Sequence, residues 1–140
     1  MKDILSEQFI VVNEKDEIIG YKSRYECHHN PSLIHRAVEV ILRTKEGKVI
    51  MQKRNMQKDL YPGYFCVTAS GHVNKDETYE SAAQRELSEE MGIKGVLLQK
   101  RKTFITREIA ETEMITLFTG EYNGEIKFAS DEVELSLIHI

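Results

Sequence analysis

The stretch GHVNKDETYESAAQRELSEEMGI, residues 71–93, decides the fold, because it holds the clearest helix in the chain. Thr78 fits the N-cap and Gly92 fits the position just after the last turn, so a helix is predicted over Tyr79–Met91. Six carboxylates crowd this turn and helix: Asp76, Glu77, Glu80, Glu86, Glu89 and Glu90. Like charges three or four residues apart on a helix repel by roughly 0.2–0.5 kcal/mol per pair. The crowding favours a role for these acids beyond stability.

Three of the carboxylates share one face of the predicted helix, because positions 86, 89 and 90 are related by i, i+3 and i+4. An apolar stripe spaced by four residues would hold the helix against a sheet: Tyr79, Ala83, Leu87 and Met91. Several carboxylate oxygens without a thiolate suit a hard divalent cation, and Mg²⁺ commonly shares such ligands with a substrate phosphate. A solvated acidic face is the alternative, and the tight clustering with few lysines argues against it.

The spacing also carries a family resemblance. Gly71, five residues, Glu77, seven residues and then Arg85-Glu86-Leu87-Ser88-Glu89-Glu90-Met91-Gly92-Ile93 resembles the Nudix box, a signature of hydrolases that cleave a diphosphate joined to another moiety. The resemblance implies a site for Mg²⁺ or Mn²⁺ built from the box: Gly71 through its carbonyl, Glu77, Glu86, Glu89 and Glu90. It further implies that Glu86 or Glu89 activates water, and that Arg85 orients a neighbouring acid, with Glu77 the expected partner.

The length and composition of the chain limit the number of domains and the kinds of partner that it can have. At 140 residues, with 41% hydrophobic and 30% charged residues, the chain fits one globular domain, which we place at residues 1–134. The net charge of -4 argues against nucleic-acid or membrane-surface partners, and no apolar run approaches the length of a membrane span. Two cysteines are too few for a disulfide framework, and no leader precedes the acidic start, so a cytoplasmic protein is expected.

Short apolar runs predict strands at residues 9–13, 18–22, 35–42, 49–54, 64–67, 97–106 and 114–122, with a loop or short helical turn at 23–33 and a turn at 68–71. One helix among many strands predicts an α+β protein. The Nudix resemblance implies a mixed β-sheet packed between helices, an α/β/α sandwich, whose C-terminal helix we expect to be missing. Residues 135–140, LSLIHI, match what the end of a sequencing-library adapter encodes, so we expect a non-native tail and exclude His139 from any site.

Outside the box, residues 9–122 resemble isopentenyl diphosphate isomerase and the Nudix hydrolases similar to it. That resemblance implies a second divalent metal on two histidines seven residues apart, a third histidine 37 residues later and two glutamates of a Glu-x-Glu. The matching residues here are His28, His35, His72, Glu111 and Glu113, with His29 disfavoured by spacing. Mixed imidazole and carboxylate ligands suit Mn²⁺ or Zn²⁺, while solvated loop residues are the alternative. The resemblance places three residues on the diphosphate: Arg24, Arg54 and Lys58.

Two departures favour hydrolysis over isomerisation, Ser70 and the intact box. Glu86, Glu89 and Glu90 are all present, whereas the isomerase's own box is degenerate in its middle glutamates. The isomerase uses a cysteine directly before the box glycine, where this chain has Ser70, and a serine hydroxyl is too weak an acid to replace a thiol. Thr106 stands where an aromatic hydroxyl is expected, which weakens the match to the isomerase further. We therefore predict a hydrolase acting on a small-molecule diphosphate, with an isomerase or a non-catalytic diphosphate-binding module as alternatives. The sequence does not assign the substrate, and it is compatible with a homodimer as well as with a monomer.

Overall fold

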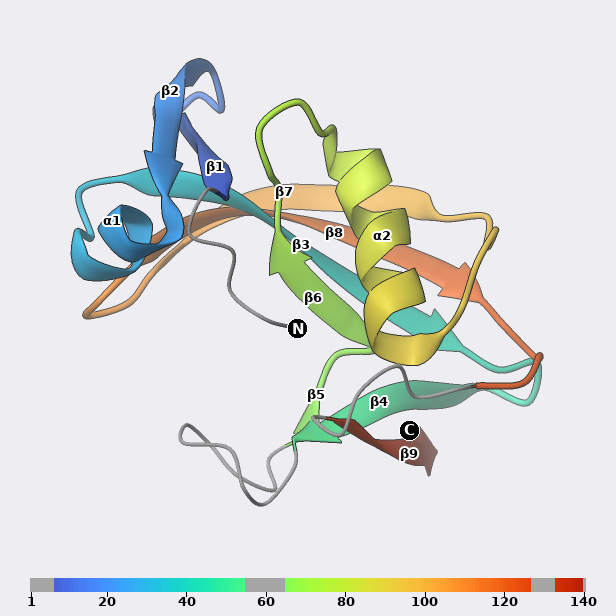
Figure 1. The fold of residues 1–140 in the computed structure, drawn as a ribbon. Coiled ribbons are helices and arrows are strands. Elements are labelled where there is room, and N and C mark those ends of the chain that lie inside the picture. The colour runs from blue at the N-terminus through green and yellow to red at the C-terminus, as the bar shows by residue number, and fades with distance from the viewer. Residues whose placement is uncertain (1–6, 55–64, 127–132, 140) are drawn as a thin grey trace.

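A computed structural model describes residues 7–54, 65–126 and 133–139, with the backbone alone for 53, 54 and 133–139. The strands are β1 (Gln8–Val12), β2 (Ile18–Ser23), β3 (Ile34–Arg43), β4 (Lys48–Arg54), β5 (Phe65–Cys66), β6 (Ala69–His72), β7 (Gln99–Arg107), β8 (Thr112–Glu121) and β9 (Val133–His139). The helices are α1 (Arg24–His29) and α2 (Tyr79–Met91). The strands form one mixed nine-stranded sheet, which confirms the predicted α+β class. Figure 1 shows α2 along one side of the sheet next to β6, and α1 beside β1 and β2.

Strand β3 organises the sheet. It pairs in parallel with β8 from Ile34 opposite Thr112 to Arg43 opposite Glu121, and antiparallel with β1, β4 and β6. Alternate β3 residues Val38, Val40 and Leu42 are fully buried in the main core, where they meet the apolar stripe of α2. Because side chains alternate across a strand, the residues between them project to the opposite face. His35 and Glu39 lie on that face.

Helix α2 begins and ends at the predicted residues. The Thr78 hydroxyl accepts a hydrogen bond from the Ser81 amide (3.0 Å), and the Ser81 hydroxyl accepts one from the Thr78 amide (3.0 Å). Gly92 has a φ of 66° and donates its amide to the Ser88 carbonyl (3.1 Å), which closes the helix with a left-handed residue. These local caps fix the helix ends independently of the sheet, so sequence alone could place them.

The predicted turn at residues 68–71 is wrong, because residues 69–72 form strand β6. The Thr68 hydroxyl accepts a hydrogen bond from the Leu42 amide (2.8 Å) and brings the chain alongside β3. From there Ala69 pairs with Val40 and His72 with Ala37. The gain of a backbone ladder with a central strand outweighs the turn propensity of Ser70 and Gly71. The box therefore starts inside the sheet.

Residues 24–29 form a short helix, within the range of the expected loop or helical turn. Ser23 caps it, with its hydroxyl accepting from the Glu26 amide at 3.1 Å. At the other end of the chain, β9 pairs antiparallel with β4 from Lys48 opposite His139 to Arg54 opposite Val133, so the predicted boundary at residue 134 falls inside a strand. That residues 135–140 are a non-native tail stays a prediction. No helix follows α2 in the described ranges, and none of the described helices is long and apolar enough to cross a membrane.

The β1–β2 hairpin is tied to α2 through Asp16, a turn residue in the left-handed conformation with a φ of 63°. Its Oδ1 accepts hydrogen bonds from Arg36 Nε (2.9 Å) and from the Tyr79 hydroxyl (2.9 Å). The Arg36 guanidinium also lies over the Tyr79 ring, 4.8 Å from its centroid. The first residue of α2 is thereby fixed to both the hairpin and β3.

Replacing Tyr79 with Phe removes the hydroxyl from this junction and keeps the ring. We expect the free energy of unfolding to fall by about 0.5–1.5 kcal/mol, the usual net contribution of one hydrogen bond. Urea unfolding followed by circular dichroism measures the change. Tyr25→Phe is the matched control, because Tyr25 is 70% exposed and should change stability by less than about 0.5 kcal/mol. Equal effects of the two variants would remove the hydroxyl from this role.

Candidate active site

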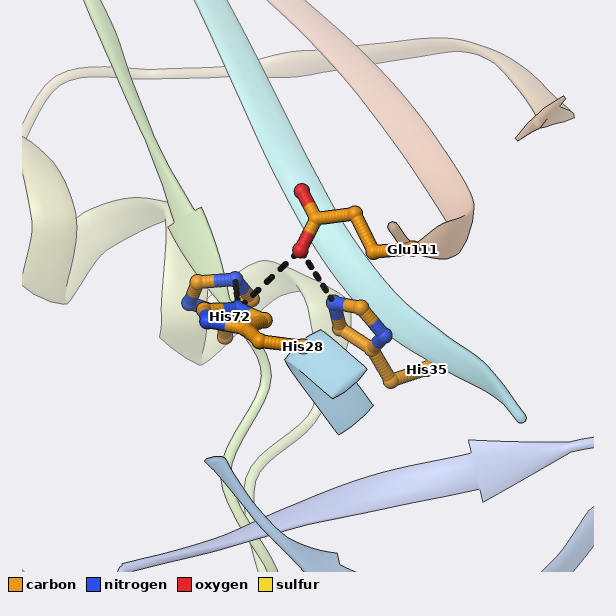
Figure 2. A group of neighbouring side chains, drawn as sticks. All are labelled: His28, His35, His72 and Glu111. Carbon is orange, nitrogen blue, oxygen red and sulfur yellow. Dashed lines mark hydrogen bonds and ion pairs between the residues drawn. The ribbon is translucent and has the colours of Figure 1, made fainter. Parts of the chain in front are cut away.

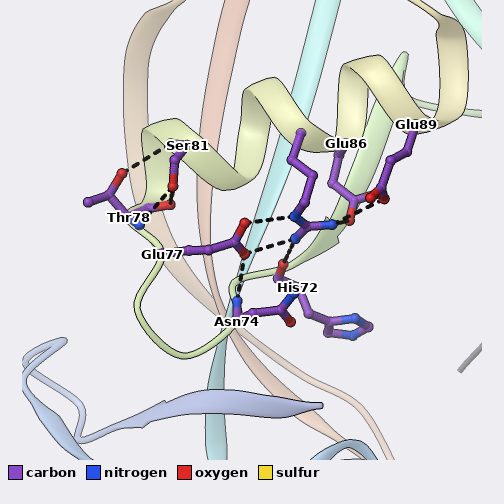
Figure 3. A network of polar contacts seen from close by, with 8 residues as sticks. His72, Asn74, Glu77, Thr78, Ser81, Glu86 and Glu89 are labelled. Atoms are coloured by element: carbon purple, nitrogen blue, oxygen red, sulfur yellow. Dashed lines mark hydrogen bonds and ion pairs between the residues drawn. The ribbon is translucent and has the colours of Figure 1, made fainter. Parts of the chain in front are cut away.

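Arg85 is the centre of a polar network on α2, and Figure 3 labels its partners Glu77, Glu86, Glu89 and His72. It donates two hydrogen bonds to Glu77, from Nε to Oε2 at 2.7 Å and from Nη2 to Oε1 at 3.0 Å. Its Nη1 contacts Glu86 Oε1 at 2.6 Å and Glu89 Oε2 at 3.2 Å, and its Nη2 reaches the His72 carbonyl at 2.8 Å. The Asn74 amide donates to Glu77 Oε1 at 2.9 Å. The guanidinium therefore joins the turn, strand β6 and two box carboxylates.

Glu86 is buried against strand β6 and is only 3% exposed. A Cβ built on Gly71 would lie 2.3 Å from the Glu86 carboxyl carbon, so only glycine leaves room for the carboxylate there. The pKa of Glu86 is raised to about 7, chiefly by burial and then by the Glu90 and Glu89 carboxylates, with the Arg85 guanidinium opposing them. A divalent cation would reverse this cost by favouring the charged carboxylate, so the donor set fits a hard metal ion.

Glu90 lies on the same face of α2 as Glu86, and residues of strands β4 and β6 hold its carboxylate in place. Its Oε1 accepts hydrogen bonds from the Ser70 amide (3.0 Å) and from Gln52 Nε2 (2.9 Å). The Glu89 side chain is 38% exposed, against 5% for Glu86, and one of its carboxylate oxygens contacts Arg85. The structure thus brings Glu86, Glu89, Glu90 and Gly71 together, as the spacing predicts. Both oxygens of Glu77 already accept hydrogen bonds.

The raised pKa of Glu86 predicts pH-dependent metal binding. A cation must displace the proton, and the charged carboxylate is lost as the pH falls through about 7, so affinity should rise with pH. Titration calorimetry with Mg²⁺ should show about tenfold tighter binding at pH 8 than at pH 6, the change in ionised fraction for such a group. Glu86→Gln should flatten this dependence. A wild-type affinity equal at both pH values would contradict the assignment.

A second cluster lies on the face of the sheet away from the core against α2, because His35 alternates with the buried β3 residues Val38 and Val40. Figure 2 shows its side chains turned toward one another. It gathers His28 from α1, His35 from β3, His72 from β6 and Glu111 from the β7–β8 loop, with one ligand atom of each within 4.8 Å of the others. His28 Nε2 lies 3.2 Å from His72 Nε2 and 3.1 Å from Glu111 Oε2. Glu113 adjoins the group, with Oε2 3.5 Å from His35 Nε2 and 3.7 Å from His72 Nε2. The five residues expected from the isomerase resemblance therefore converge.

The chemistry of this cluster fits a metal ion. His35 is fully buried, and both of its ring nitrogens lack a hydrogen-bond partner within the described part of the chain. Burial lowers the pKa of His72 well below its usual value, and His35 and His28 lower it further, which keeps the imidazole neutral and able to ligate. His29 instead contacts the Tyr25 carbonyl (2.8 Å) and stacks on the Tyr25 ring. His28, not His29, joins the cluster.

The sequence analysis did not identify three residues that hold the side chains of the two sites in place. Phe9 stacks on His72 with ring centroids 4.2 Å apart and also packs on His35, while Gln52 and Asn74 hold Glu90 and Glu77. Nothing local distinguishes them from ordinary strand and loop residues. Of the expected phosphate-binding residues, Arg24 places its guanidinium 5.4 Å from the Phe9 ring centroid, beside the histidine cluster. Arg54 ends β4, and its side chain, like Lys58, lies outside the described residues.

A model of the Nudix domain matches residues 33–137, which include the whole box. The chain belongs to the Nudix family. An uncharacterised Nudix hydrolase of Escherichia coli is 33% identical over 123 residues, 88% of this chain and 68% of the relative. These findings confirm the predicted family and its hydrolase class.

The branch within this Nudix family also matches the prediction. Human isopentenyl-diphosphate delta-isomerase 2 is 38% identical over 104 residues, which are 65% of this chain and 46% of that protein. The fold resembles a crystal structure of a Deinococcus radiodurans protein with a TM-score of 0.78 at 22% identity, covering 95% of this chain and 83% of the other. At the two positions where the isomerase resemblance predicts a cysteine and an aromatic hydroxyl, this chain has Ser70 and Thr106.

Proposed function

We propose that this protein is a Mg²⁺- or Mn²⁺-dependent hydrolase that cleaves a small-molecule diphosphate linked to a second moiety, through water attack at phosphorus. The observation that carries the proposal is the grouping of the box carboxylates Glu77, Glu86 and Glu89 around Arg85, beside a glycine that leaves room for Glu86. The proposal keeps the predicted cytoplasmic location, involves neither nucleic acid nor membrane, and leaves a homodimer open.

The roles follow from the contacts. Glu86, Glu89, Glu90 and the Gly71 carbonyl would hold the cation, which when bound neutralises the bridging phosphates and makes water more acidic. Glu77 was expected among the ligands, but it accepts two hydrogen bonds from Arg85 and one from Asn74, so we assign it to positioning Arg85. The Glu89 side chain is 38% exposed, against 5% for Glu86, and Glu89 would accept the proton of the attacking water, with Glu86 as the alternative.

A second divalent metal, Mn²⁺ or Zn²⁺, is proposed at His28, His35, His72, Glu111 and Glu113. The support is His35, which is fully buried, has no hydrogen-bond partner for either ring nitrogen among the described residues, and places Nε2 within 4.0 Å of Glu111 and Glu113. Arg24 lies beside it and, with Arg54 and Lys58, keeps its predicted role in binding the diphosphate. The two metals would then lie on opposite sides of β6, one for each face of the sheet.

The second metal site predicts a defined loss of affinity. Glu111→Gln removes one ligand from an accessible loop, and the affinity for Co²⁺ is expected to fall at least about tenfold. Visible absorption of bound Co²⁺ reports imidazole ligation and so separates this site from the all-oxygen box. Glu108→Gln, an exposed carboxylate of the same loop, is the matched control and should bind as the wild type does. Equal affinities for both variants would exclude Glu111 as a ligand.

The hydrolase assignment is tested with a substrate panel. Phosphate or nucleotide release is measured with Mg²⁺ and Mn²⁺ on nucleoside triphosphates, dinucleotides, ADP-ribose, sugar nucleotides, coenzyme A and isoprenoid diphosphates. Turnover of at least one compound is expected. Tight binding of one compound without turnover of any would instead support the non-catalytic module. Conversion of isopentenyl to dimethylallyl diphosphate, followed by proton NMR, would support the isomerase, and none is expected because Ser70 replaces the thiol.

A further inference from the structure

Glu39 lies on the same face of the sheet as the histidine cluster and beside the start of the box. It pairs with Ser70 of β6 on one side and with Leu117 of β8 on the other. Side chains of directly paired residues share a face, so the Glu39 carboxyl and the Ser70 hydroxyl are neighbours. Glu113 lies close enough on this face to act electrostatically on Glu39. Glu39 and Ser70 place neighbouring polar side chains on one face of the sheet, and we call them the Glu39–Ser70 floor.

The floor is directly connected to the two proposed metal sites. The Ser70 amide holds Glu90 Oε1 at 3.0 Å, and the next residue but one, His72, places its ring in the histidine cluster and its carbonyl on Arg85. In the described part of the sheet β6 pairs with β3 alone, and at its other edge the Ser70 amide and the His72 carbonyl are hydrogen-bonded to Glu90 and Arg85 of the box. The box therefore borders this edge, and a substrate whose diphosphate lies at the box would extend its second moiety across it and over the floor.

The floor has polar groups left for a ligand. Within the described residues, neither the Glu39 carboxyl nor the Ser70 hydroxyl has a hydrogen-bond or ion-pair partner. The surroundings are apolar, since Ala37 and Ile115 on the same face are 4% and 6% exposed. Burial raises the pKa of Glu39, and the Glu113 carboxylate raises it further. A partly buried carboxyl without a donor is costly, and a ligand that supplies one removes that cost.

We propose that Glu39, together with Ser70, selects diphosphates whose second moiety carries a hydroxyl or amine donor and disfavours purely hydrocarbon moieties. This inference rests on the proposed function and names the class of its second moiety. A hydrocarbon group over the floor would leave the carboxyl and hydroxyl desolvated and unpaired, which is the strongest form of discrimination that a binding site has. A sugar hydroxyl, a polyol or an amine would satisfy both groups. Glu39 is thus a specificity residue for the leaving or retained moiety.

The test uses matched probes: alkyl diphosphates of three to five carbons, each compared with its terminal hydroxyl and terminal amine analogues. Wild-type kcat/KM is expected to favour the hydroxyl or amine member by at least about tenfold. In Glu39→Val, which suits a strand, this ratio should collapse to within about twofold. Glu39→Gln should retain selectivity for the hydroxyl and weaken it for the amine, because a neutral amide oxygen still accepts a hydrogen bond but cannot form an ion pair with an ammonium.

The control and the overturning results are defined on the same probes. Glu121→Val removes a carboxylate from the far end of β8, and its selectivity should equal that of the wild type. A wild type that prefers the plain alkyl probes, or a Glu39→Val variant that keeps the wild-type ratio, overturns the inference. If no probe or panel compound is hydrolysed, the proposed function fails separately. The same ratios in dissociation constants, from titration calorimetry with Mg²⁺ present, then support or overturn the role of Glu39.

Discussion

Glu89→Gln is expected to lower kcat for hydrolysis by about 10²–10⁴-fold, the usual contribution of a positioned general base. The amide keeps the size of the side chain and removes the charge that would accept a proton and hold a cation. The Glu89 side chain is 38% exposed, and its Oε2 lies 3.2 Å from Arg85 Nη1. Initial rates at saturating substrate and metal, for whichever panel compound is turned over, measure the loss. Glu90→Gln should also lose orders of magnitude, because it removes a ligand.

Glu80→Gln is the matched control for these variants. Glu80 lies on the first turn of the same helix, is exposed and makes the same change of charge away from the box cluster. Its kcat should stay within about twofold of the wild type, as surface substitutions usually do. A Glu89→Gln rate within fivefold of the wild type, with unchanged circular dichroism, would remove Glu89 from the mechanism and leave Glu86 as the base.

Arg85→Met should cause the largest loss of stability, about 3 kcal/mol in the free energy of unfolding. The side chain of Arg85 is 23% exposed, and those of Glu77 and Glu86 are 20% and 5% exposed, so removal of the guanidinium leaves carboxylates unpaired in a poorly solvated site. It also abolishes the link to the His72 carbonyl. Urea unfolding at pH 8, where Glu86 is charged, measures the loss. Arg85→Lys should recover only part of it, because a lysine cannot form the paired contacts with Glu77.

Arg107→Met is the control for stability. Arg107 pairs with Glu14 at 3.5 Å, but the two side chains are 57% and 77% exposed, so its loss should cost less than about 1 kcal/mol. Adding Glu77→Gln to Arg85→Met should restore about 1 kcal/mol, because the second change removes an unpaired charge. Equal losses for the Arg85 and Arg107 variants would show that the network around Arg85 does not hold α2 on the sheet.

Helix α2 and most strands could be predicted from the sequence, because their signals are local. Thr78 and Gly92 cap the helix through neighbouring residues, and alternation along β3 marks its buried face. Strand β6 could not be predicted. Ser70 and Gly71 suggest a turn when read alone, and only pairing with β3 makes the segment extended. The short range of sequence patterns explains both outcomes.

The residues of the candidate sites also differ in whether local sequence patterns could identify them. Glu86, Glu89 and Glu90 were found because one helical turn brings them together wherever the helix lies. The histidine cluster was found only through a family resemblance, because His28, His35 and His72 come from α1, β3 and β6 and no local rule joins them. Gln52, Phe9 and Glu39 carried no signal, since their roles depend on which strand lies next to which.

The sequence by itself determined the helix, its caps and the shared face of three carboxylates, because backbone geometry within one helix follows from spacing. Only the tertiary structure decided which of these acids is buried, where the arginine points and what lies across β6. Burial of Glu86 requires Gly71 of another element, and its pKa of about 7 follows from that burial and from Glu90. Desolvation and charge pairing between elements depend on packing, so only the assembled sheet could set them.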